Sequence, residues 1–199
     1  YNPERLFEFY GIAGLTYKRS YQYGNGNNLF GGVLGFQGNF TLTPLIDLYI
    51  EPKVTLANDT YNDRRKDLER KFDLLPEVTV GVTYNMVPDE KRKTTDFTNS
   101  GFKNNVFFTT AFGVQRVTTR LMDLKGRNYA GFSGMLGFGG WFNQIQGLRL
   151  SALAGFAPYI PDNGVTSENM LINGVGRADY LVNYSNLFEL IVLTLQCLC

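Results

Sequence analysis

The stretch FGGVLGFQGNF, residues 30–40, returns 102 positions later as FSGMLGFGGWF, residues 132–142. Seven of the eleven positions are identical, and the identical residues are glycine, leucine and phenylalanine. Self-similarity at a fixed offset indicates a repeated structural unit. The same offset superimposes the alternating apolar positions of residues 46–56 on those of residues 148–158. The sequence therefore predicts a single domain, residues 1–199, made of two related four-stranded halves at 1–86 and 104–199.

Side chains in both copies alternate with a period of two, which is the period of a β-strand. In the first copy, Phe30, Leu34 and Phe36 lie on one face, whereas Val33 and Gln37 lie on the other. The high content of aromatic residues and glycine, with 16 Phe, 12 Tyr and 22 Gly, also favours an all-β chain. The alternation predicts eight strands, at residues 5–18, 28–41, 45–57, 73–86, 104–117, 128–142, 147–158 and 183–197.

The predicted connections alternate between short and long. Residues 41–44 and 143–146 form short turns, whereas long polar segments cover residues 21–28, 58–71, 118–127 and 159–182. Barrels of the outer membrane show this asymmetry, with short periplasmic turns and longer external loops. The exception is the charged connection at residues 87–103, which joins the two halves on the short-turn side. We interpret it either as a linker left by duplication or as a contact for a periplasmic partner.

The face opposite the apolar rows distinguishes a membrane barrel from a soluble one. A soluble barrel hides its apolar row inside and presents a polar face to water, whereas a membrane barrel turns the apolar row towards lipid. Here the opposite face carries small residues such as Gly31, Gly35 and Ser133 with only isolated charges. This composition is typical of a narrow lumen that side chains fill, and it predicts an antiparallel up-and-down transmembrane β-barrel. A soluble lipocalin-like barrel is the alternative.

Charged residues on the predicted inner face would be buried in such a lumen. Single buried charges are costly, so these residues are expected to pair with one another. We predict an internal ion-pair network with a structural role. Its candidate members are Asp47, Glu51, Lys53, Glu77 and Arg149.

The composition argues against several classes of function. The net charge of +1, from 19 basic and 18 acidic residues, provides no field to attract nucleic acid. The chain has no histidine, so it lacks the usual general base and the commonest metal ligand. Ser133, in GFSGM, imitates a nucleophile elbow only partly and is interpreted as a packing residue. We expect no catalytic site, no metal site and no cofactor.

Aromatic residues near the predicted strand ends would suit the interfaces where a membrane meets water. Ordinary strand preference explains them as well. These residues are Tyr17, Phe40, Tyr84, Tyr129 and Phe142.

The run from Leu48 to Met86 contains YIEPKVTLAND, a charged loop, and FDLLPEVTVGVTYNM. In its alternation of glycine, aromatic and charged positions it resembles the small OmpA-like outer-membrane barrels of the Bacteroidota. The resemblance implies an eight-stranded barrel located in the bacterial outer membrane. It implies no active residue.

These observations lead to one main functional hypothesis and two alternatives. The main one is a non-enzymatic outer-membrane barrel with a filled lumen, which acts as a structural or accessory subunit of a membrane protein complex. Its expected partners are outer-membrane lipid and other membrane or periplasmic proteins. The first alternative is a narrow porin or a conduit for a small hydrophobic ligand. The second is the soluble lipocalin-like binding barrel.

Overall fold

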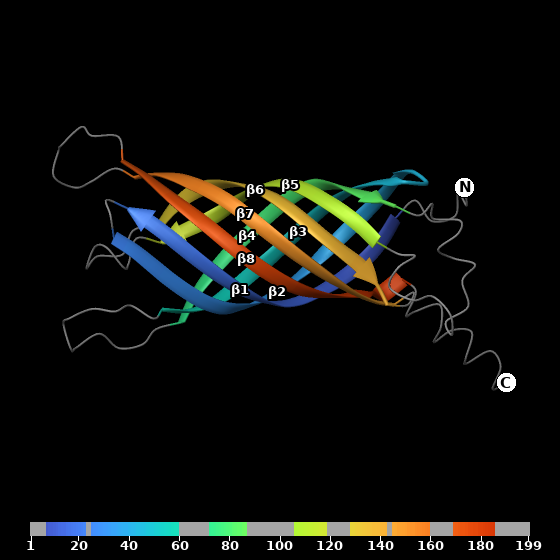
Figure 1. Ribbon diagram of the computed structural model, residues 1–199, viewed down its shortest axis with the longest axis horizontal. Coiled ribbons are helices and arrows are strands. Elements are labelled where there is room, and N and C mark those ends of the chain that lie inside the picture. Colours follow the sequence, from blue (N-terminus) through green and yellow to red (C-terminus); the bar gives the residue numbers. More distant parts are fainter. Residues whose placement is uncertain are drawn as a thin grey trace.

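The computed structural model describes residues 7–22, 25–59, 72–86, 106–118, 128–142, 145–159 and 169–185. Eight strands form one closed barrel, in which each strand is hydrogen-bonded to the next (Figure 1). The strands are β1 (Phe7–Gln22), β2 (Asn25–Thr43), β3 (Ile46–Asp59), β4 (Phe72–Asn85), β5 (Val106–Thr118), β6 (Asn128–Trp141), β7 (Gln146–Tyr159) and β8 (Asn169–Asn183).

The barrel closes where the last strand pairs with the first. All eight neighbouring pairs are antiparallel. The β1–β8 seam extends from the pair Tyr10–Asn183 to the pair Tyr21–Ile172. The prediction of a closed, eight-stranded antiparallel barrel is therefore confirmed. Within the described ranges, no helix is long and apolar enough to cross a membrane.

We call the end that carries the β2–β3 and β6–β7 connections the turn end, and the opposite end the loop end. In Figure 1 the arrowhead of β1 marks the loop end, on the left. Both turn-end connections are short, because β2 ends at Thr43 and β3 begins at Ile46, while β6 ends at Trp141 and β7 begins at Gln146. The two short turns predicted from the sequence are confirmed.

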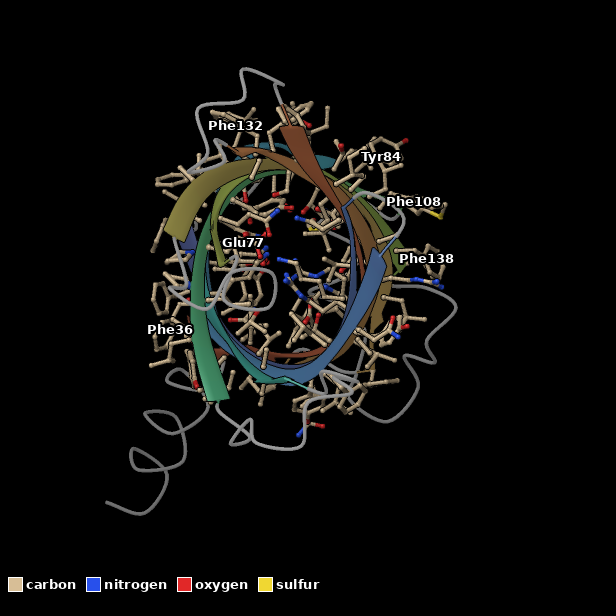
Figure 2. All side chains as sticks on the ribbon, turned by 90° about the vertical axis from the view of Figure 1, so that its left-hand side faces the viewer. Phe36, Glu77, Tyr84, Phe108, Phe132 and Phe138 are labelled. Carbon is tan, nitrogen blue, oxygen red and sulfur yellow. The ribbon has the colours of Figure 1, made fainter. Side chains whose placement is uncertain are left out.

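The outer wall of the barrel is apolar and exposed. Phe30 is 55% exposed, Phe132 is 52% exposed, and Phe112 reaches 78%. Figure 2 shows labelled aromatic side chains, among them Phe36 and Phe132, projecting outwards from the ribbon, whereas nitrogen and oxygen atoms gather inside it. A soluble barrel would bury these phenylalanine rows, so the predicted outward orientation of the apolar rows is confirmed and the lipocalin-like alternative is wrong.

Inward-facing glycines leave room for larger side chains in the lumen. A Cβ atom added to Gly81 would lie 2.6 Å from Cζ of Tyr49, and one added to Gly35 would lie 2.7 Å from Cβ of Lys53. Atoms this close overlap, so only glycine fits beside these side chains. At outward-facing Gly176, by contrast, an added Cβ would meet nothing within 4 Å.

Apolar side chains also occupy part of the lumen. Buried residues form one cluster at the turn end, one in the middle and one at the loop end. The turn-end cluster is Ile12, Phe107 and Leu181, the middle cluster is Tyr49, Ala111, Met135, Leu153 and Val175, and the loop-end cluster is Leu29, Ala57 and Leu75. At the turn end, Trp141 packs against its cluster, with its ring 5.2 Å from that of Tyr10.

The predicted position of the eighth strand is wrong. The structure has β8 at Asn169–Asn183, within a segment predicted to be a long loop, and residues 186–199 lie outside the described residues. The outward row of β8 contains two glycines, Gly174 and Gly176, which carry no apolar side chain. The alternation of apolar and polar residues is therefore weak in β8. The strand was instead predicted in the more apolar sequence that follows, at residues 183–197.

The connection between the first two strands is also shorter than predicted. Instead of a loop over residues 21–28, β1 continues to Gln22 and β2 begins at Asn25, with Arg19 paired to Asn28. Polar residues can extend a hairpin beyond the apolar part of its strands, because the hydrogen-bond ladder needs no apolar side chain. The connection at residues 87–103 and most residues of the other predicted loops lie outside the described residues.

Candidate functional site in the barrel lumen

The five candidate residues all lie in the lumen, at different heights along the barrel. Each is buried, and Glu51 and Arg149 are only 0% and 1% exposed. Along β3, Asp47 is nearest the turn end, and Glu51 and Lys53 follow towards the loop end. Glu77 faces inwards from β4, and Arg149 from β7.

Two ion pairs join neighbouring strands, because the strand register places their members opposite each other. Arg149 on β7 is paired with Asp179 on β8, and its Nη2 lies 2.8 Å from Oδ2 of that carboxylate. Lys53 on β3 is paired with Glu77 on β4, with 3.6 Å between Nζ and Oε1. Directly opposed positions of an antiparallel sheet bring their side chains within contact distance.

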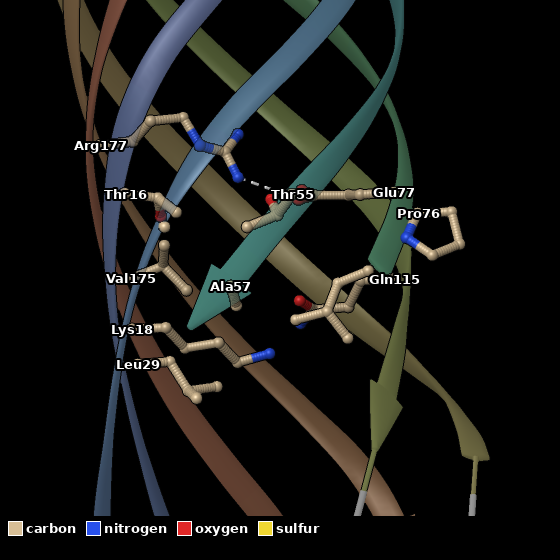
Figure 3. A pocket seen from close by; sticks show the side chains of 12 residues that line it. Thr16, Lys18, Leu29, Thr55, Ala57, Pro76, Glu77, Gln115, Val175 and Arg177 are labelled. Atoms are coloured by element: carbon tan, nitrogen blue, oxygen red, sulfur yellow. Dashed lines mark hydrogen bonds and ion pairs between the residues drawn. The ribbon is translucent and has the colours of Figure 1, made fainter. Parts of the chain in front are cut away.

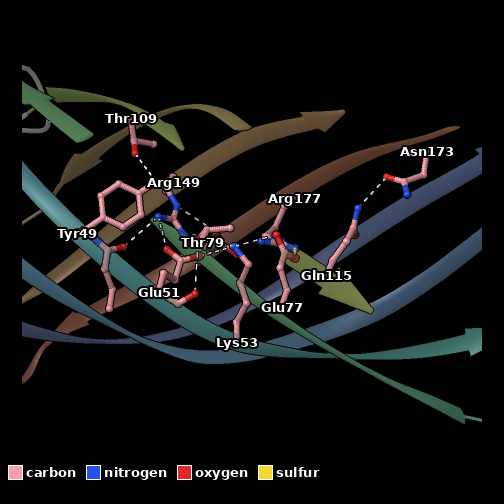
Figure 4. A network of polar contacts seen from close by, with 12 residues as sticks. Tyr49, Glu51, Lys53, Glu77, Thr79, Thr109, Gln115, Arg149, Asn173 and Arg177 are labelled. Atoms are coloured by element: carbon pink, nitrogen blue, oxygen red, sulfur yellow. Dashed lines mark hydrogen bonds and ion pairs between the residues drawn. The ribbon is translucent and has the colours of Figure 1, made fainter. Parts of the chain in front are cut away.

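Two more ion pairs span the lumen between strands that lie four positions apart in the closed barrel. Nη1 of Arg149 on β7 lies 2.7 Å from Oε2 of Glu51 on β3. Nη2 of Arg177 on β8 lies 3.0 Å from Oε2 of Glu77 on β4. These two contacts tie opposite sides of the wall together, as Figure 4 shows from close by.

A fifth contact, between Nζ of Lys53 and Oε1 of Glu51 at 2.5 Å, links the cross-lumen pairs. The result is one continuous series in which negative and positive side chains alternate. We call it the central ion-pair chain, and its members in order are Asp179, Arg149, Glu51, Lys53, Glu77 and Arg177.

Neutral polar groups complete the surroundings of the chain. Arg149 also donates from Nη1 to Oε1 of Gln37 at 3.0 Å. Thr109 donates from its hydroxyl to the hydroxyl of Tyr49 at 2.8 Å. Nearer the turn end, Asn85 donates from Nδ2 to Oδ2 of Asp47 at 2.7 Å, so this carboxylate lies apart from the chain.

The arrangement favours a structural role for the chain. Its three acidic and three basic side chains cancel, so no net charge is buried. Removing one member of a buried pair leaves its partner uncompensated, which typically costs about 3–5 kcal/mol. No group of three or more His, Cys, Asp or Glu that could hold a metal occurs among the residues described by the structure.

Three charged lumen residues in the part of the chain that the structure describes were not among the sequence candidates. Arg177 and Asp179 were missed because their strand, β8, was predicted to be a loop. Lys18 faces inwards from β1 and was not among the predicted members of the ion-pair network. Polar residues recur in β8 at even spacings, at Asn173, Arg177 and Asp179. This period of two could have identified Arg177 and Asp179 as lumen residues.

A hollow lies on the outer wall of the barrel. It spans β4 to β7, has an open volume of about 670 Å³, and is lined by apolar groups that include Val82, Tyr84, Phe108 and Leu136. Because it faces away from the lumen, it provides no passage along the barrel axis.

Comparisons with known proteins identify the fold but no family. No family model and no curated protein matches the chain. Neisserial surface protein A is similar in structure, with a TM-score of 0.51, 11% identity, and 87% of this chain and 96% of that chain covered. Ail, the attachment invasion locus protein of Yersinia pestis, in complex with the heparin analogue sucrose octasulfate, has a TM-score of 0.48 and 12% identity, covering 87% and 98%. These neighbours are small eight-stranded outer-membrane barrels of Gram-negative bacteria.

Proposed function

We propose that this chain is a bacterial outer-membrane barrel of the small OmpA-like type, which acts as a structural or accessory subunit of a membrane protein complex. The observation that carries the proposal is the inverted polarity of the barrel. An exposed apolar wall surrounds a lumen occupied by the central ion-pair chain. An apolar outer band with a polar interior is the arrangement of barrels that span outer membranes.

The aromatic residues of the wall support the membrane location. Near the turn end, Phe7 and Phe40 contact each other with ring centroids 4.9 Å apart, and Tyr84 and Phe142 are also exposed. Near the loop end, Tyr17 is exposed. Aromatic rings at both ends suit the two interfaces between membrane and water. The side chain of Tyr129 lies outside the described residues.

The filled lumen favours a subunit role over transport. The two cross-lumen ion pairs lie in the path that a solute would follow. With the lumen occupied, the loops and the outer wall are the surfaces left for contacts with other molecules. The charged connection at residues 87–103, which contains Asp89–Lys93, is a further surface for a periplasmic protein.

Membrane insertion is tested first. The protein, expressed in a Gram-negative host, should need detergent for extraction and should migrate differently on a gel before and after boiling. In planar bilayers, a plugged barrel should give no steady current. A stable conductance would instead support the narrow porin.

The subunit role is tested by crosslinking in intact cells followed by identification of the captured proteins. Replacing the charged residues at 89–93 by serine should remove a periplasmic partner, and the matched control replaces Arg64, Arg65 and Lys66 in the connection on the opposite side. Recovery of the barrel without crosslinked proteins would contradict the proposal. The Bacteroidota origin and the descent of the two halves from one repeated unit stay predictions.

A further inference from the structure

The lumen contains one small cavity near its loop end. It lies between the Arg177–Glu77 pair and the side chains of Lys18 and Gln115 (Figure 3). The space open to the centre of a water molecule is about 20 Å³. A cavity needs roughly 10–15 Å³ by this measure to hold one water molecule. The cavity therefore has room for a single occupant of about that size.

The cavity carries an excess of positive charge. Its charged lining residues are Lys18, Arg177 and Glu77, so two cations share one carboxylate. That carboxylate is already engaged, since Oε2 lies 3.0 Å from Arg177 and Oε1 lies 3.6 Å from Lys53. Among the described residues that line the cavity, the charges sum to one positive charge.

Lys18 lines the cavity from β1. Its side chain is only 8% exposed, and in Figure 3 it extends from β1 across the lumen towards Gln115. No hydrogen bond or ion pair joins it to any residue that the structure describes. Lys53, which lies nearer the middle of the barrel, is by contrast paired with Glu51 and Glu77. Arg177 also has unpartnered donors at Nε and Nη1 within the same described part of the chain. An ammonium that is largely withdrawn from water is stabilised by a nearby negative charge, which a bound anion would supply.

We propose that this cavity is a binding site for a single monovalent anion of chloride size, held by the Lys18 ammonium and favoured by the positive charge of Arg177. The small volume of about 20 Å³ favours a monatomic anion over sulfate or phosphate, each of which has five heavy atoms. This inference concerns the lumen alone and holds whether or not the barrel serves as a subunit.

The binding test measures the unfolding of the whole chain in detergent at constant ionic strength, with sodium chloride replacing sodium sulfate. A ligand that binds only the folded state shifts the unfolding equilibrium by the factor 1 + [L]/Kd. At a chloride concentration ten times the Kd, we expect a shift of about tenfold towards the folded state. Bromide should act like chloride, and sulfate should not.

Two variants locate the effect. Lys18→Met should remove the chloride dependence, whereas Arg19→Met, which deletes the same charge from an exposed neighbouring position, should retain it. Crystals soaked in sodium bromide should show an anomalous peak beside Nζ of Lys18 in the wild type and in Arg19→Met. The peak should be absent in Lys18→Met, while the change in gel mobility on boiling shows that this variant is still folded.

Three results would overturn the proposal. The first is a wild-type stability that does not depend on chloride at constant ionic strength. The second is a bromide peak that persists in Lys18→Met. The third is electron density for a carboxylate of the chain itself against Nζ of Lys18, which would mean that the protein supplies its own anion.

Discussion

Arg149 and Lys18 are both buried cations of the same lumen, but their surroundings differ. Arg149 has Glu51 at 2.7 Å, Asp179 at 2.8 Å and the amide oxygen of Gln37 at 3.0 Å. Lys18, nearer the loop end, has no acceptor among the described residues and lines a cavity. Burial alone therefore does not define the role of a lumen charge. A cation with a complete set of acceptors ties strands together, whereas one without them leaves a position for a ligand.

The largest effect is expected at Arg149. Arg149→Met should destabilise the barrel by about 3–5 kcal/mol, because it leaves the carboxylates of Glu51 and Asp179 without their shared partner. Urea unfolding of the folded barrel in detergent, followed by tryptophan fluorescence, measures this change.

A variant that removes the matching charges provides the control. Combining Arg149→Met with Asp179→Asn should recover much of the lost stability, since Glu51, Lys53, Glu77 and Arg177 then remain as two charges of each sign. A double variant less stable than the single one would show that Asp179 stabilises the barrel through other contacts.

A smaller effect is expected at Glu77, which belongs both to the central ion-pair chain and to the cavity. Glu77→Gln should cost about 3 kcal/mol, the lower end of the range for a broken buried pair, because Arg177 and Lys53 lose a carboxylate but the glutamine amide still fills its place. The same variant adds one positive charge to the loop end, so its chloride stabilisation should exceed that of the wild type. A variant with the stability and the chloride response of the wild type would show that Glu77 contributes neither to the central ion-pair chain nor to the cavity.

A neutral contact beside the chain should matter less. Tyr49→Phe removes the hydroxyl that accepts from Thr109, and the loss should be about 0.5–1.5 kcal/mol. The same unfolding measurement applies, with Thr109→Val as the matched variant. The double variant should cost no more than about the larger of the two single changes, because both remove the same hydrogen bond.

The smallest effect, and the opposite direction, is expected at Lys18. In chloride-free sulfate buffer, Lys18→Met should be as stable as the wild type or more stable by up to about 1 kcal/mol. It replaces a buried charge that has no acceptor among the described residues with an apolar side chain of similar length. A loss as large as that of Arg149→Met would show that Lys18 has an acceptor after all. The two regions would then not differ.

Much of the barrel could be predicted from alternation. The strands around Phe30 and Phe132 have strong apolar rows, and the structure turns both rows outwards. β8 was misplaced because its outward positions include Gly174 and Gly176, which give no apolar signal. Alternation assigns a residue to a face of the wall, but it does not report how far along that face a glycine-rich strand extends.

The candidate site shows a similar limit. Period two placed Glu51 and Arg149 on the inner face, and the structure has them there. Their contact depends on the register and closure of the sheet, which bring β3 and β7 to opposite sides of one narrow lumen. Whether Lys18 meets an acceptor depends on the height at which each inward side chain ends, which a single sequence does not encode in a readable pattern.

The position of Arg177 and Asp179 on the last strand has a consequence for assembly. Before β8 is in place, the seven preceding strands contain Arg149 without Asp179 and Glu77 without Arg177. The arriving strand carries one charge of each sign and completes both contacts while it forms the seam with β1. The strand that seals the wall therefore also supplies a partner for Arg149 and one for Glu77, so closure of the barrel and completion of its internal ion pairs depend on the same fifteen residues.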